Sequence, residues 1–171
     1  TFTLIHVRGI RIAVDWSWFL IFFLVILSAS SRFGEALGQS STAAEPFALA
    51  VVSAIGFFGS ILLHELGHAF AALRRGIGIS SIQLWIFGGL ARLDRESDSP
   101  EAEFEVAVAG PAVTLAIVAV LYVSGSIATG FAEFGHTCRL AVEFKSEAGV
   151  SGFVSLISWL AAINAIILVF N

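Results

Sequence analysis

Four long apolar stretches constrain this chain more than any other feature of its sequence. They lie at about residues 14–30, 46–73, 104–123 and 150–170. A helix needs about 20 residues to cross the hydrocarbon of a bilayer, and each stretch approaches or exceeds that length. Charged residues make up 13% of the chain, against roughly a quarter in soluble domains. The sequence therefore predicts an α-helical membrane protein with about four transmembrane helices.

The segments between these stretches predict a small amount of β-structure. Residues 1–13 alternate apolar and polar side chains like a short N-terminal strand. Residues 77–93 are rich in β-branched and aromatic side chains around Gly88 and Gly89, which predicts a β-hairpin. Because unpaired backbone amides are costly in lipid, this hairpin is expected at the membrane edge. With no internal repeat or linker, residues 1–171 are predicted to form a single transmembrane domain.

The third apolar stretch has a recognisable start. Ser99 is a good helix N-cap and Pro100 suits the first helical position. Glu103 and Glu105 are interpreted as acids of the first turns, where they complement the helix dipole. Residues 125–149 are more mixed and predict an interfacial loop or short helix.

The second apolar stretch contains ILLHELGHAFAALRR, in which two histidines and a glutamate interrupt the apolar residues. Ionisable groups are costly inside a membrane span and usually mark a functional site. His64 and His68 are four residues apart, so a helix places them on one face, where both can bind one metal ion. In H-E-x-x-H the imidazoles hold zinc and the glutamate, here Glu65, takes a proton from the water that zinc activates. The motif predicts a Zn²⁺ site.

A catalytic zinc site normally has three protein ligands, and the residues alone do not supply the third. His6 and His136 are interpreted as ordinary histidines of the N-terminal arm and a loop. The aspartates lie in connections or at helix ends, and none is assigned as a ligand: Asp15, Asp94 and Asp98. The single cysteine, Cys138, excludes an internal disulfide framework.

Three strings together carry a family resemblance: HELGH, FGGLARLDRE and EFEVAVAGPAVTLA. In this order and spacing, over nearly the whole chain, they resemble the site-2 protease family of intramembrane zinc metalloproteases. The resemblance implies that His64 and His68 are zinc ligands and that Glu65 is the general base. Asp15 departs from the pattern, since relatives often have a histidine there.

The C-terminal string NAIILVFN resembles the start of the last core motif of that family. There an asparagine helps to hold the substrate carbonyl, and the resemblance assigns this role to Asn171; Asn164 lies two turns earlier on a similar face. The third zinc ligand of the family is the aspartate of an Asp-Gly pair beyond this point. The sequence ends at Asn171, so we expect a truncated core that lacks this ligand and is inactive as it stands.

The leading functional prediction is a zinc metalloendopeptidase that cleaves membrane-spanning proteins with zinc-activated water, as in regulated intramembrane proteolysis. The hairpin is expected to present the substrate strand by β-pairing. One alternative is a catalytically incomplete scaffold or pseudoprotease that binds partner helices. A transporter with a midplane ion site fits less well, because such proteins often contain paired repeats. Self-association is left open, and the net charge of −4 argues against nucleic acid as a partner.

Basic residues predict the orientation in the cell membrane. Four spans would leave six on the side of the N-terminus and the hairpin (Arg8, Arg11, Arg74, Arg75, Arg92 and Arg95) and three on the other side (Arg32, Arg139 and Lys145). The positive-inside tendency then places the N-terminus and the mouth of the active site in the cytoplasm.

Overall fold

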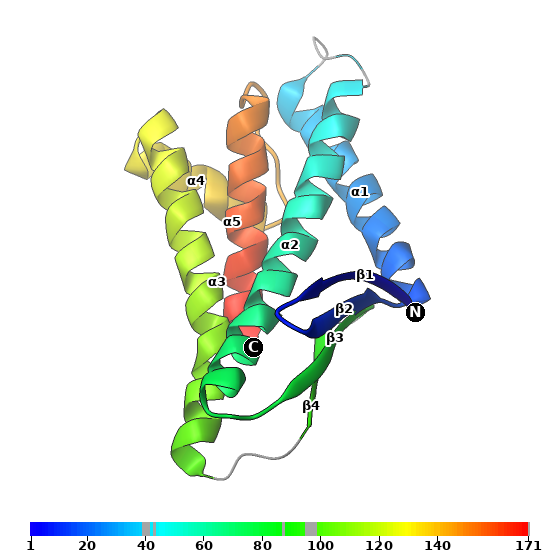
Figure 1. The fold of residues 1–171 in the computed structure, drawn as a ribbon. Helices are drawn as coiled ribbons and strands as arrows, with labels where there is room; N and C mark the ends of the chain where they lie inside the picture. Colours follow the sequence, from blue (N-terminus) through cyan, green and yellow to red (C-terminus); the bar gives the residue numbers. More distant parts are fainter. Residues whose placement is uncertain (39–41, 43, 87, 95–98, 171) are drawn as a thin grey trace. The chain divides into compact units, whose positions relative to one another are not determined.

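The computed structural model describes residues 1–38, 42, 44–86, 88–94 and 99–170. Over these residues the elements follow in the order β1 (Phe2–Val7), β2 (Ile10–Val14), α1 (Trp16–Leu37), α2 (Ala44–Arg74), β3 (Ile79–Trp85), β4 (Gly88–Leu93), α3 (Pro100–Thr129), α4 (Phe131–Val142) and α5 (Gly152–Phe170) (Figure 1). Four helices, α1, α2, α3 and α5, are long and apolar enough to cross a membrane. The predicted fold class, a helical membrane protein with a small β-structure, is confirmed.

The chain divides into two compact units. The first unit comprises Thr1–Phe22 and Gly59–Val113, and the second comprises Phe23–Phe58 and Thr114–Asn171. The first unit therefore contains all four strands and the C-terminal half of α2, whereas the second is helical. Each unit is described by itself below, and the predicted single domain stays a prediction.

The N-terminal arm forms two strands where the sequence suggested one. Arg8 (φ 49°) and Gly9 (φ 87°) both adopt left-handed backbone conformations, which suit a two-residue hairpin turn between β1 and β2. The alternation of side chains runs through both strands, so it did not reveal the turn. Strand β2 then pairs in parallel with β3, and the sheet has the order β1-β2-β3-β4.

The predicted hairpin is confirmed as β3 and β4, which pair antiparallel. Its glycine pair lies in the second strand and not at the turn: Gly88 is opposite Trp85, and Gly89 is opposite Leu84. Gly88 has a φ of 127°, which side-chain-bearing residues rarely adopt.

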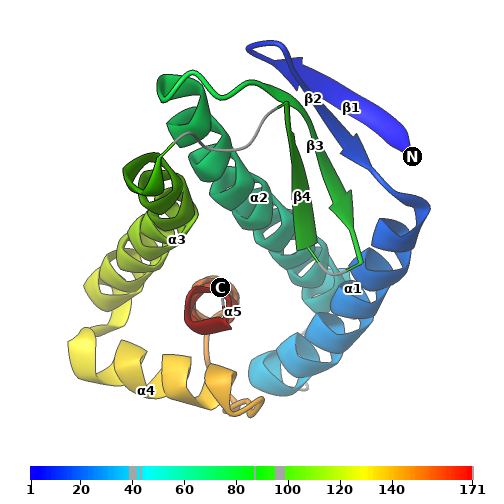
Figure 2. The ribbon, with the colours of Figure 1, turned by 90° about the horizontal axis from the view of Figure 1, so that it is seen from below.

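The core of the first unit lies between the sheet and α2. Ala69 and Ala72 are three residues apart on one face of α2, and their small side chains allow close packing with Ile10 of β2 and Ile82 of β3. All four residues are almost fully buried. Figure 2 shows the sheet on one side of this helix. This packing holds the HELGH turns of α2 next to the sheet.

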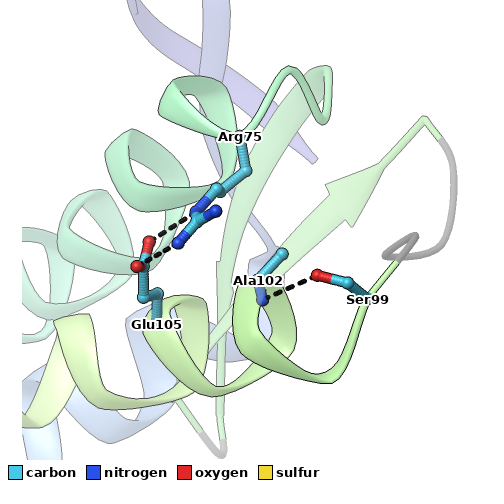
Figure 3. A network of polar contacts seen from close by, with 4 residues as sticks. All are labelled: Arg75, Ser99, Ala102 and Glu105. Atoms are coloured by element: carbon cyan, nitrogen blue, oxygen red, sulfur yellow. Dashed lines mark hydrogen bonds and ion pairs between the residues drawn. The ribbon is translucent and has the colours of Figure 1, made fainter.

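The start of α3 is fixed by the predicted cap and by an ion pair. Ala102 donates its backbone N–H to Ser99 Oγ at 3.2 Å, so the predicted N-cap is confirmed. Glu105 has a second role that the sequence did not reveal, because it accepts two hydrogen bonds from the Arg75 guanidinium just beyond α2 (Figure 3). These hydrogen bonds raise the pKa of the Arg75 guanidinium above its ordinary value. The ion pair joins the end of α2 to the first turns of α3.

The second unit is held by close contacts between helices. The predicted interfacial segment 125–149 contains α4, whose Phe134 is fully buried. Phe134 packs with Val154 and Ile157 of α5, and its ring occupies the space that a side chain at Gly125 would need. The absence of a Cβ at Gly125 of α3 therefore makes room for the fully buried ring of Phe134.

Candidate metal centre

The two motif histidines meet on one face of α2. His64 Nε2 and His68 Nε2 are 3.0 Å apart, and the two rings are nearly perpendicular. His64 is only 3% exposed, and His68 is half-buried. The helix therefore brings two imidazole nitrogens together in an otherwise apolar environment, as the i, i+4 spacing predicted.

Helix α3 fixes the tautomer of one of these histidines. His68 Nδ1 is 2.7 Å from the backbone carbonyl oxygen of Val106. A carbonyl oxygen can only accept, so Nδ1 donates the hydrogen, and in the neutral ring His68 Nε2 carries the lone pair. That lone pair faces His64 Nε2, which is within hydrogen-bond distance and can donate to it when no metal is bound. Metal-binding histidines commonly have a carbonyl or carboxylate partner of this kind on the other ring nitrogen.

The backbone of α3 approaches the histidine pair at Gly110. A Cβ at this position would overlap His68 Nε2 and would stand 2.7 Å from His64 Nε2. On the facing helix, a Cβ at Gly67 would stand 2.8 Å from the carbonyl oxygen of Ala109. The small residues of the two helices therefore bring α3 against α2 at the level of the histidines, as small residues do in membrane helix pairs.

The pair fits two ligands of one zinc ion. Nitrogens bound at about 2.0–2.1 Å to a tetrahedral zinc ion stand about 3.3 Å apart, so the observed 3.0 Å needs only a few tenths of an ångström of adjustment. Over the described residues, no group of three His, Cys, Asp or Glu side chains converges on a common point. The described residues thus bring together two nitrogens at a distance that suits one zinc ion.

Glu65 lies beside the histidine pair but contacts a different element. Its side chain is half-buried and rests against Gly89 of β4, where a Cβ would be 2.7 Å from Glu65 Oε1. The carboxylate thus rests against the first residues of β4.

The other polar candidates lie elsewhere. In the first unit, His6 is opposite Arg11 in the β1–β2 hairpin, and Asp94 lies against Gly78. Asp15 Oδ1 accepts the backbone N–H of Ser17 at the start of α1, which lowers the pKa of this carboxyl group.

Two candidates belong to the second unit. His136 is 3.5 Å from Glu147 and lies in α4, so its interpretation as a loop histidine is wrong. Asn164 is 1% exposed, and its Nδ2 donates to the carbonyl oxygen of Leu160 at 2.9 Å. Asn171 lies outside the described residues, so its predicted role stays a prediction.

Three groups that shape the site were missed by sequence reasoning: the Val106 carbonyl, Gly89 and Gly110. The two glycines do belong to the strings FGGLARLDRE and EFEVAVAGPAVTLA, which contributed to the resemblance. Nothing in either string shows what a glycine there would contact.

Comparison with known proteins shows the family of this chain. The sequence profile of Peptidase family M50 matches residues 52–171. The chain belongs to peptidase family M50. This confirms the predicted family, since a site-2 protease from Methanocaldococcus jannaschii has a similar structure, with a TM-score of 0.56, 25% identity and coverage of 96% of this chain and 62% of that one.

Two curated relatives of this M50 chain are classed by name among the zinc metalloproteases. A protein of Synechocystis sp. is 43% identical over 121 residues, which cover 69% of this chain and 31% of the relative. Rip3 of Mycobacterium tuberculosis is 31% identical over 166 residues, or 97% of this chain and 38% of the relative. The chain thus spans about a third of the length of these relatives.

Proposed function

We propose that this M50 protein is an intramembrane zinc metallopeptidase that hydrolyses a peptide bond of a membrane-spanning protein. The observation that carries the proposal is the histidine pair, with its Nε2 atoms 3.0 Å apart and His68 Nδ1 held by the Val106 carbonyl. At this distance the two nitrogens can share one hydrogen bond, or both can bind one metal ion. The proposal assigns His64 and His68 to the metal.

The remaining roles are those that the family resemblance implies. A bound zinc ion would polarise the scissile carbonyl and make a water molecule more acidic. Glu65 would accept the proton of the attacking water and pass it to the leaving nitrogen. Asn171 would support the substrate carbonyl, and the third ligand is expected from the motif that begins there.

Strand β4 offers a place for the substrate. It lies at one end of the sheet, and its Leu90 side chain is 51% exposed. An edge strand has unpaired amide and carbonyl groups on its outer side, which can pair with an extended peptide. A membrane-spanning helix that unwinds locally could add such a strand close to Glu65.

A bilayer is the environment that the helices require, and the basic residues favour one orientation in it. Large apolar side chains on α1, α3 and α5 are exposed, among them Leu27 (67%), Ile127 (82%) and Val169 (78%). The first unit contains most of the described basic residues: Arg8, Arg11, Arg74, Arg75 and Arg92. We therefore propose that the first unit faces the cytoplasm.

The test is the Glu65→Gln variant of the full-length protein in proteoliposomes. The probe is a synthetic apolar segment of about 20 residues with flanking lysines, a fluorophore and a quencher. Glu65→Gln should lower its cleavage at least about 100-fold, because a general base is lost, while zinc content stays unchanged. Glu45→Gln, in the first turn of the same helix, is the matched control and should cleave normally. Normal cleavage by Glu65→Gln would contradict the mechanism.

A second candidate function is a zinc-binding or partner-binding scaffold without peptidase activity. It is favoured by one observation, the lack of a third ligand over the described residues. If the full-length wild type binds zinc but does not cleave a panel of such apolar segments, this second function replaces the first.

A further inference from the structure

The two adjacent glycines at the start of β4 meet different requirements. Gly88 has a φ of 127°, and a Cβ on it would have nothing within 4 Å. Gly89 has no such backbone constraint, but a Cβ there would overlap the Glu65 side chain, standing 2.5 Å from Cδ and 2.7 Å from Oε1. Real Cβ atoms essentially never come within 3.0 Å of another group. Backbone conformation thus favours glycine at 88, and the space taken by Glu65 favours it at 89.

Both sides of this contact are held in place. Gly89 is opposite Leu84 of β3, which is 3% exposed, so the strand cannot easily move away from α2. Glu65 is four residues before Ala69, the fully buried α2 residue that packs against the sheet. The carboxylate therefore leaves α2 on the face that meets the sheet.

We propose that Gly89 is a positioning residue for Glu65. Strand β4 presents bare backbone to the Glu65 side chain and thereby limits where its carboxylate can lie beside the histidine pair. The inference rests on the proposed function, in which Glu65 is the general base. It adds that β4, the strand expected to pair with the substrate, also positions the general base Glu65. Substrate docking and proton transfer therefore depend on the same short stretch of the β4 backbone.

The first experiment measures kcat and KM of the full-length Gly89→Ala variant with the apolar fluorogenic segment described above. The added methyl group should displace the carboxylate, and kcat should fall about 100-fold, as expected for a misplacement of about 1 Å. KM and zinc content should change little. Gly59→Ala is the matched control, because it makes the same change on α2, where a Cβ would have nothing within 4 Å. A normal kcat for Gly89→Ala would overturn the inference.

A second experiment separates positioning from simple damage to the strand. The unfolding midpoint is measured for Gly89→Ala in the wild type and in the Glu65→Ala background. Because Glu65→Ala removes Cγ, Cδ and Oε1, Gly89→Ala should change the midpoint less favourably in the wild type than in this background, where the added methyl group meets no carboxylate. Equal changes in both backgrounds would mean that the two residues do not interact, and would overturn the inference.

The two proposals can fail separately. If Glu65→Gln cleaves normally, the proposed function fails, although the unfolding experiment still reports whether Gly89 confines Glu65. If Glu65→Gln is inactive but Gly89→Ala keeps its kcat, the positioning role is wrong and the proposed function stands.

Discussion

The two units place polar groups in an apolar chain in different ways. In the first unit, His64, Glu65 and His68 lie close to one another and to the backbone of α3 and β4. In the second unit, the buried polar residues are serine, threonine and asparagine, spread over α2, α3 and α5. Over the described residues, Ser53 Oγ, Ser126 Oγ and Asn164 Oδ1 have no hydrogen-bond partner. Convergence therefore distinguishes the candidate site from polar groups that are merely buried.

The glycines differ in the same way. At Gly56 and Gly125 of the second unit, the missing Cβ makes room for apolar side chains, Leu160 and Phe134. At Gly89 and Gly110 of the first unit, it makes room for Glu65 and for the histidine pair. A glycine in a membrane helix usually serves packing. The side chains that a glycine faces show whether it also shapes a functional site.

The largest effect should come from the second unit and should concern stability alone. Phe134→Ala removes a fully buried aromatic ring between α3, α4 and α5. We expect the free energy of unfolding to fall by about 3–5 kcal/mol, with no change in zinc affinity of the folded protein. Denaturant titration and zinc titration measure the two quantities. A large loss of zinc affinity would contradict the view that Phe134 stabilises the second unit without affecting the zinc site of the first.

The next effect should concern the metal alone. Gly110→Ala would push a methyl group into His68 Nε2, so zinc affinity should fall about 10–100-fold. Gly34→Ala is the control, because a Cβ there has nothing within 4 Å. Competition with a zinc chelator of known affinity would measure both variants. If Gly110→Ala binds zinc like the wild type, the backbone of α3 does not shape the site.

The last prediction leaves the fold intact and reports burial in the second unit. Burial raises the pKa of the Cys138 thiol to about 11. At pH 8 very little thiolate is then present, and alkylation should be about 100-fold slower than for the same cysteine in the denatured chain. The rate should increase as pH rises towards the pKa. Equal rates in the folded and denatured chains would place Cys138 in solvent.

Local features were predictable from the sequence because they depend on neighbouring residues. The Ser99 cap could be predicted from the residues that directly follow it. The histidine pair could be predicted because any α-helix brings residues four apart onto one face. The parallel pairing of β2 with β3 joins segments about 70 residues apart, and periodicity contains no information about such partners. The contacts of Gly89 and Gly110 were hidden for a related reason, since a glycine has no side chain whose chemistry could suggest a neighbour.

The most direct test of the central claim is metal binding by the four histidine variants. The full-length wild type and the His64→Ala, His68→Ala, His6→Ala and His136→Ala variants would be loaded with cobalt(II) as a spectroscopic substitute for zinc, and their absorption and metal content would be measured. Removing either motif histidine should abolish the tetrahedral cobalt spectrum, whereas the other two variants should match the wild type. If His64→Ala and His68→Ala retain the spectrum, the histidine pair is not the metal site.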